Sequence, residues 1–139
     1  MFKKILVPLD GSKLAEGIVP RVEWLAKIHD GEVTLIRVAL AHTFPGVDPV
    51  QHQVNVVREA EEYLARVEAN LKGVGVKVKS VVRYGHDAQE IVDHARDRDF
   101  DLIAMSTHGR TGLTQFVLGS VASKVINTAT VPILLCRVC

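Results

Sequence analysis

One stretch of the chain, "STHGRTGLTQFVLGS" at residues 106–120, gathers residue types that could bind a ligand. It follows the apolar run "DLIAM" and contains three glycines and five hydroxyl side chains. Gly109 and Gly112 permit positive φ angles and a close approach of the backbone to a ligand. Gly119 and Ser120 precede "VASKVI", and the unpaired N–H groups at the start of such a helix favour an anion. The pattern is typical of a loop that binds phosphate.

A second candidate for ligand chemistry lies near the start of the chain, in "PLDGS" at residues 8–12. Asp10 follows an apolar run, and its carboxylate could accept hydrogen bonds from ribose hydroxyls. The same residues could equally form only a turn and a helix cap. Neither G-x-x-x-x-G-K-[ST] nor G-x-G-x-x-G after the first strand occurs in the chain, so no generic nucleotide fingerprint decides between the two interpretations.

Periodicity predicts strands that alternate with helices along the whole chain. Short β-rich or apolar runs predict strands at residues 3–9, 32–40, 76–84, 101–106 and 131–138. Helical patterns lie between them, at about 12–29, 57–71, 87–95 and from 120 onward. This alternation predicts an α/β fold, with a parallel sheet covered by helices on both faces. We expect one domain that spans residues 1–139.

Three local signals refine the helices. Pro20 cannot donate to the carbonyl of Glu16, so the first helix is expected to kink or to begin late. Gly73 is expected to close the helix at 57–71. Asp87 with Glu90 three residues later has the pattern of a capping box.

The connection at residues 41–53 holds two prolines and a glycine. It is expected to be a mobile surface loop.

In open parallel sheets, ligands bind beyond the carboxyl ends of the strands, where the strand order reverses. If the first and fourth strands are neighbours, residues 8–12 and 106–112 flank that crevice. The two candidate segments would then form one site.

Composition excludes several classes of protein. The chain has 139 residues, of which 47% are hydrophobic and 24% charged, as in ordinary globular proteins. Its formal charge of +1 comes from 17 basic and 16 acidic residues mixed along the chain, so we expect no nucleic-acid partner. No apolar stretch has the length of a signal peptide or a membrane span, so we expect no membrane partner and a cytoplasmic location.

Cysteine, histidine and aromatic residues give weaker signals. Cys136 and Cys139 have C-x-x-C spacing, but they lie at the end of an expected strand. A redox or metal site, an intermolecular disulfide and an inert strand end therefore remain alternatives. His29, His42, His52, His86 and His94 have no ligand spacing and are expected at the surface. Trp24 and Phe116 are expected to pack in the core.

Three segments together resemble the universal stress protein family. They are "KKILVPLDGS" at the start, "DLIAMSTHGRTGLTQFVLGSVASKVI" in the last third, and "VPILL" near the end. The signature of nucleotide-binding members is Gly, two residues, Gly, nine residues, then Gly followed by Ser or Thr. Gly109 and Gly119-Ser120 match its later positions, whereas Ser106 replaces the first glycine.

The resemblance implies an open five-stranded parallel sheet in the order 3-2-1-4-5, Rossmann-like and similar to the adenine nucleotide alpha hydrolases. It also implies ATP or AMP as the bound nucleotide, accompanied in some members by Mg²⁺, although the chain has no evident carboxylate cage for a metal. Asp10 would meet the adenosine and the backbone at Val38 the adenine edge, whereas Gly109, Gly119 and Ser120 would hold the phosphates. The complete set of site residues that it implies is Pro8, Leu9, Asp10, Val38, Met105, Ser106, His108, Gly109, Arg110, Gly119, Ser120 and Val121.

A homodimer through the C-terminal strand at residues 131–138 is also expected. This strand is apolar and would lie at a sheet edge, which invites pairing with another chain. Members of the family commonly pair in this way.

Three functions compete at this stage. The first is a regulatory module of the stress response that binds ATP or AMP, and the second is a nucleotide-free dimeric interaction protein with the same fold. The third is an enzyme on a similar sheet, such as an ATP pyrophosphatase or a nucleotidyl transferase. The chain lacks both the serine-glycine-glycine loop and the His-x-x-His pair of those enzymes, so slow ATP hydrolysis is the most that we expect.

Overall fold

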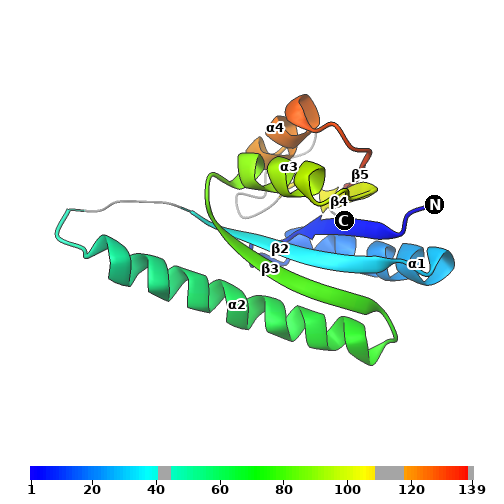
Figure 1. Ribbon diagram of the computed structural model, residues 1–139, viewed down its shortest axis with the longest axis horizontal. Helices are drawn as coiled ribbons and strands as arrows, with labels where there is room; N and C mark the ends of the chain where they lie inside the picture. The colour runs from blue at the N-terminus through cyan, green and yellow to red at the C-terminus, as the bar shows by residue number, and fades with distance from the viewer. Residues whose placement is uncertain (41–44, 109–117, 138–139) are drawn as a thin grey trace.

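A computed structural model describes residues 1–40, 45–108 and 118–137 of the chain. Strands and helices alternate along the chain as the periodicity predicts (Figure 1). In chain order they are β1 (Lys4–Pro8), the 3₁₀ helix η1 (Ala15–Ile18), α1 (Val19–His29), β2 (Glu32–Leu40), α2 (Pro49–Gly73), β3 (Lys77–Gly85), α3 (Asp87–Asp97), β4 (Leu102–Ser106), α4 (Ser120–Thr128) and β5 (Ile133–Cys136).

The five strands form one parallel sheet in the order β3-β2-β1-β4-β5. The predicted fold class and strand order are therefore confirmed. The chain leaves β1 toward β2 on one side and later returns to β4 on the other, so the strand order reverses between β1 and β4. The carboxyl ends of these two strands are the expected place for a ligand.

Two apolar clusters cover the two faces of the sheet. Neighbouring residues of a strand point to opposite faces, so Val7 belongs to the cluster under α1 and α2, whereas Leu6 belongs to the cluster under α3 and α4. Figure 1 shows the two helix pairs on opposite sides of the sheet. Because both faces are covered, the central strands can be apolar without interruption, and Ile5, Leu6 and Val7 have no exposed surface.

The first helix begins late, as its proline predicts. The single turn η1 precedes α1, and Pro20 lies in the first turn of α1. N–H groups in the first turn have no acceptor within the helix, so the missing N–H of proline costs nothing there.

The second helix is longer than its apolar spacing predicts. It begins at Pro49, so the prediction of a loop through residue 53 is wrong over its last five positions. The reason is a strong helix start, because the Asp48 carboxylate accepts a hydrogen bond from the N–H of Val50 at 3.0 Å and Pro49 supplies a preset φ angle. Gly73 is the last helical residue, and the chain turns at Gly75, whose φ is +90°. Residues 41–44 lie outside the described part of the chain.

The prediction of a capping box at the start of the third helix is wrong. His86 is the N-cap residue and Asp87 is already the first residue of α3, so the Asp87 side chain does not occupy the N-cap position that a capping box requires. Its carboxylate instead accepts a hydrogen bond from the N–H of Ala88 at 2.7 Å.

Burial corrects two further predictions. Trp24 is 64% exposed and Ile28, one turn later, is 56% exposed, so Trp24 lies on the outer face of α1 rather than in the core. His94 is buried in α3, close to Phe100, although it was expected at the surface. Its helical position places it on the inner face with Ile91 and Ala95.

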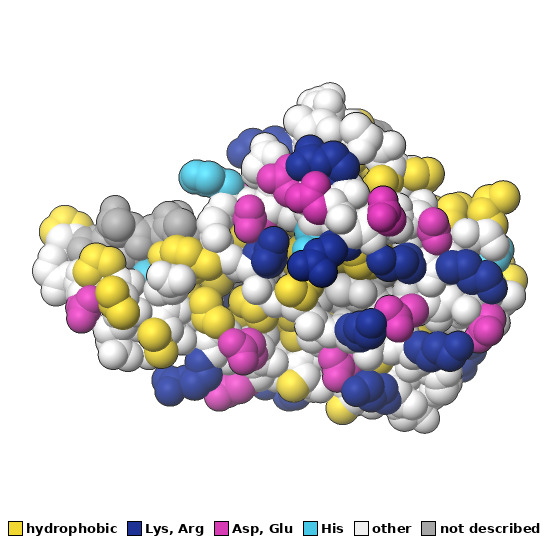
Figure 2. All heavy atoms as spheres, in the orientation of Figure 1, with side chains coloured by type: hydrophobic (Ala, Val, Ile, Leu, Met, Phe, Trp, Pro, Cys, Tyr) yellow, Lys and Arg dark blue, Asp and Glu magenta, His cyan; other side chains and the backbone are white. Residues whose placement is uncertain are grey.

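The described surface mixes charges of both signs. On the face drawn in Figure 2, Lys and Arg side chains lie beside Asp and Glu side chains. Exposed apolar side chains gather just before and on the first turns of α2, at Val47, Val50 and Val54. None of the described helices combines the length and the hydrophobicity needed to cross a bilayer.

Candidate functional site

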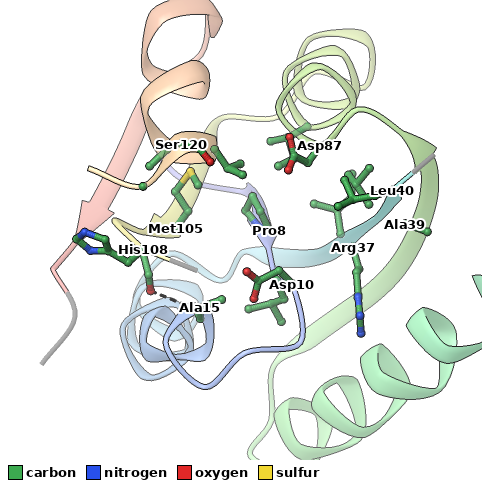
Figure 3. A pocket seen from close by; sticks show the side chains of 18 of the residues that line it. Pro8, Asp10, Ala15, Arg37, Ala39, Leu40, Asp87, Met105, His108 and Ser120 are labelled. Carbon is green, nitrogen blue, oxygen red and sulfur yellow. Dashed lines mark hydrogen bonds between the residues drawn. The ribbon is translucent and has the colours of Figure 1, made fainter. Parts of the chain in front are cut away.

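A cavity of about 510 Å³ lies at the carboxyl ends of β1, β2 and β4. Its walls come from the ends of these strands, from the first residues of α3 and α4, and from the N-terminal half of α2 (Figure 3). All the predicted site residues that the structure describes line it: Pro8, Leu9, Asp10, Val38, Met105, Ser106, His108, Gly119, Ser120 and Val121. The predicted residues Gly109 and Arg110 lie outside the described part of the chain.

Asp10 is held by the turn that follows β1. One carboxylate oxygen, Oδ1, accepts hydrogen bonds from the N–H and the hydroxyl of Ser12, at 2.9 and 2.6 Å. The Ser12 hydroxyl also accepts a hydrogen bond from the N–H of Ala15, at the start of η1. Gly11, with φ at +90°, allows the sharp change of direction. These contacts fix the carboxylate at the floor of the cavity.

Ser106 ends β4 with its side chain turned away from the cavity centre. The hydroxyl donates a hydrogen bond to the carbonyl oxygen of Ala15 at 3.1 Å, and the residue is buried. Positive φ angles among the described non-glycine residues occur only at Asp30 and Asp99, so the backbone at Ser106 has no need of glycine. The hydroxymethyl group therefore packs against η1 without strain.

Gly119 is required by lack of space rather than by its backbone angles. It is the N-cap of α4 with φ at −61°, which any residue can adopt, and its N–H donates to the carbonyl oxygen of Thr107 at 2.8 Å. A Cβ atom at this position would lie 2.9 Å from that oxygen and 3.4 Å from the Cα of His108. The close contact joins the end of β4 to the start of α4 and brings the first N–H groups of α4, from Ser120 onward, to the cavity wall.

His108 lies beside this junction. Its Nδ1 atom is 3.0 Å from the hydroxyl oxygen of Thr107, which orients the ring at one end of the cavity (Figure 3).

Three charged residues line the cavity without having been predicted as site residues: Arg37, Glu59 and Asp87. The Arg37 side chain is 10% exposed, and its guanidinium lies over the ring of Tyr63 at 5.1 Å and 3.7 Å from Glu59. An arginine inside the apolar run "VTLIRVAL" was the available signal, because a buried charge requires a partner or a ligand. His52, expected at the surface, also lines the cavity from α2.

Tyr63 lies behind Arg37 as a neutral hydrogen-bond donor. Its hydroxyl donates to Glu16 at 2.8 Å. Burial, and then the bond to Glu16, raise the pKa of Tyr63 well above its ordinary value of 10. Tyr63 therefore supports the wall and does not act as a base at neutral pH.

The metal that the family resemblance implies finds no cage in this cavity. Within residues 1–40, 45–108 and 118–137, no three His, Cys, Asp or Glu side chains converge to hold an ion.

Comparison with known proteins places the chain in a family. The model of the universal stress protein family matches residues 1–137. The chain belongs to the universal stress protein family. The resemblance to this family that the sequence motifs indicated is therefore confirmed.

Individual universal stress proteins cover almost the whole chain. The protein MJ0531 of Methanocaldococcus jannaschii is 34% identical over 142 residues, which cover 99% of this chain and 83% of that protein. The solved structure of MJ0577, from the same organism, superposes with a TM-score of 0.90 at 32% identity, covering 99% of this chain and 96% of the other. A universal stress protein from Archaeoglobus fulgidus, solved in complex with dAMP, has a TM-score of 0.73 at 22% identity, with 97% and 98% of the two chains covered.

Proposed function

We propose that this universal stress protein binds an adenine nucleotide, ATP or AMP, in the cavity at the carboxyl ends of β1 and β4. It would act as a regulatory module of the stress response. The observation that carries the proposal is the convergence of Asp10, Val38, Met105, His108 and Gly119-Ser120 on one cavity. They come from β2, from β4, from the start of α4 and from the segments that follow β1 and β4.

The chemistry of the cavity wall changes from one end to the other, as a nucleotide requires. The end formed by His108 and the start of α4 presents N–H groups and a positive helix end, which suit phosphate. Asp10 lies between the two ends, where a carboxylate accepts hydrogen bonds from ribose hydroxyls. The lining also includes the apolar side chains of Val38, Leu40 and Ile91, which suit a flat base.

Solved relatives support a nucleotide of this kind. One universal stress protein of similar fold was solved with dAMP and another with cAMP. Both carry an adenine base, which agrees with the base that the family signature implies for this chain. Gly109 and Arg110 would complete the phosphate end.

Regulation suits this site better than catalysis does. The fixed Asp10 turn and the Gly119 junction provide binding groups. We therefore propose at most slow ATP hydrolysis.

We also propose that residues 1–139 form a single domain and that the protein is located in the cytoplasm.

Mass spectrometry of the natively purified protein tests the proposal. After denaturation, the supernatant should contain ATP, ADP or AMP in a fixed ratio to the protein. Protein stripped of nucleotide should take up AMP again during dialysis against millimolar AMP. A stripped, folded protein that takes up no adenine nucleotide would contradict the proposal and favour the alternative, a nucleotide-free interaction protein.

A further inference from the structure

Asp87 has a place in the cavity that its role in α3 does not explain. It is the first residue of α3, yet His86 is the N-cap and no capping box forms. Its side chain lines the cavity on the side opposite Asp10, with Pro8 between the two carboxylates (Figure 3). Within the described chain its only hydrogen bond joins Oδ1 to the N–H of Ala88. Among the described residues the second oxygen, Oδ2, accepts no hydrogen bond, and the side chain lines the cavity.

The surroundings of Asp87 suit a base rather than a phosphate. Figure 3 shows Leu40, at the end of β2, on the same side of the cavity as Asp87. The lining also includes Ile91, one turn further along α3, and Val38, two residues before Leu40 in β2. An apolar wall binds the faces of an aromatic ring, and a single polar group at its rim decides which ring edge fits. A phosphate would be repelled by the carboxylate.

The carboxylate is an acceptor of hydrogen bonds. It lies at the N-terminal end of α3. An ionised carboxylate accepts hydrogen bonds and donates none. It therefore discriminates between a ring edge that carries an amine and one that carries a carbonyl oxygen.

We propose that Asp87 is a specificity-determining residue, whose Oδ2 accepts a hydrogen bond from the exocyclic amine at position 6 of the purine. The inference rests on the proposed nucleotide function and deepens it. The amine of adenine has two hydrogens, so the backbone at Val38 and the carboxylate of Asp87 can both accept from it. Guanine and hypoxanthine place an oxygen at position 6, which meets the carboxylate as acceptor against acceptor.

Calorimetric titration of AMP and IMP into the wild-type protein and into Asp87→Asn measures this directly. The wild type should bind AMP at least about 10-fold more tightly than IMP, the scale expected for a hydrogen bond to a charged group. In Asp87→Asn this ratio should fall toward one or reverse, because the amide can turn its NH₂ group toward the oxygen of IMP. Asp87→Ala should weaken AMP binding and relieve the repulsion of IMP, so the ratio should fall here as well.

Two controls separate the possible causes. Asp93→Asn removes a carboxylate from the same helix outside the cavity, where Asp93 bonds Gln89 and Arg96, and should leave the AMP to IMP ratio unchanged. Purine riboside 5′-monophosphate, which has hydrogen at position 6, should bind the wild type less tightly than AMP. The difference measures the whole contribution of the amine, to the backbone at Val38 and to Asp87 together, and equal affinities would overturn the inference.

The outcomes are distinguishable. If AMP binds but Asp87→Asn keeps the wild-type ratio, or if the wild type binds AMP and IMP equally, the inference is overturned and the proposed function stands. If the folded wild type binds none of these nucleotides, both are overturned.

Discussion

At the level of single residues, Gly119 gives the strongest constraint on the proposed site. A side chain at this position meets the carbonyl oxygen of Thr107, a backbone atom that cannot move without shifting β4 or α4. We predict that Gly119→Val abolishes adenine-nucleotide binding, because the start of α4 is displaced from the phosphate end of the cavity. Calorimetry on the folded variant measures this.

Gly73→Ala is the matched control for Gly119→Val. A Cβ atom there meets nothing within 4 Å, so this variant should bind nucleotide like the wild type. Wild-type affinity in folded Gly119→Val would show that the phosphate end is not where we place it.

Asp10 should contribute to affinity through a hydrogen bond of its charged carboxylate. Asp10→Ala is predicted to weaken AMP binding by about 1–3 kcal/mol, the range for such a bond. Ser12→Ala serves as the comparison, because it removes one internal partner of Asp10 while keeping the carboxylate, and it should weaken binding less. Equal AMP affinities for Asp10→Ala and the wild type would exclude a contact between Asp10 and the nucleotide.

Ser106, which replaces a glycine of the family signature, should matter more for stability than for binding. Its hydroxyl bonds the buried carbonyl of Ala15, so Ser106→Gly should lower the free energy of unfolding by about 1–2 kcal/mol through the lost bond and the added chain entropy. Urea denaturation measures this change. AMP affinity should stay the same or improve, and a large loss of affinity would show that the hydroxyl contacts the ligand.

His94 should make stability depend on pH. Burial lowers the pKa of His94 below its ordinary value of 6.5, and the positive charges of Arg83, Arg98 and Lys4 lower it further against the opposite effect of Asp97. Its Nδ1 atom is also buried without a hydrogen-bond partner in the described chain. The folded state therefore favours the neutral ring, whereas the unfolded chain takes up a proton as the pH falls through about 6.5.

The sign follows from the protons bound. Below pH 6.5 the unfolded state binds more protons, so stability is complete above this pH and is lost as the pH falls toward the lower pKa of the folded state. The free energy of unfolding changes by at most about 1.4 kcal/mol per pH unit for one proton. Urea denaturation between about pH 5 and 7.5, a range that includes the ordinary histidine pKa of about 6.5, should show a smaller slope for His94→Leu than for the wild type. Identical slopes would exclude His94 as the source.

Single residues also show what the sequence could and could not predict. The resemblance located Asp10 and Gly119-Ser120 in the cavity wall because their segments follow strand ends, where position along the chain determines position in the fold. Trp24 was assigned to the core and Arg37 was missed. Residue type alone does not decide burial, which depends on the helix face or on neighbours distant in the sequence.

At the level of secondary-structure elements, local chemistry predicted types better than boundaries. The proline rule placed the start of α1 correctly because it acts within one turn. The start of α2 was missed, since its first turns expose Val50 and Val54 and so lack the apolar periodicity that predicts a helix. The capping box of α3 failed because its pattern can occur one residue inside a helix.

The edge strand β5 carries a prediction of its own. Ile133, Leu134 and Leu135 are only half-buried at the edge of the sheet, so we predict a homodimer that pairs this strand. Light scattering at micromolar concentration should give twice the mass of one chain. Leu134→Lys should shift the protein toward the monomer, whereas Val74→Lys, at another exposed apolar position, should not. A wild-type monomer would contradict the prediction.

At the level of the whole molecule, the alternation of strands and helices was sufficient to predict a parallel sheet with two covered faces. The strand order came from the family resemblance, since periodicity does not tell on which side of β1 the later strands add. Once the order is fixed, the reversal between β1 and β4 brings residues 8–10 and 105–108 together at the carboxyl ends of these two strands. The walls from α2 and α3 could not be predicted in this way, because they depend on how far each helix extends past the sheet.

The central claim is that this cavity binds an adenine nucleotide, and calorimetric titration of the stripped wild-type protein tests it most directly. ATP, ADP and AMP would each be titrated with and without Mg²⁺, beside Gly119→Val under the same conditions. We predict saturable binding of at least one of these nucleotides at one site per chain in the wild type, and none in the variant. Folded wild-type protein that binds none of the three, with or without Mg²⁺, would contradict the claim.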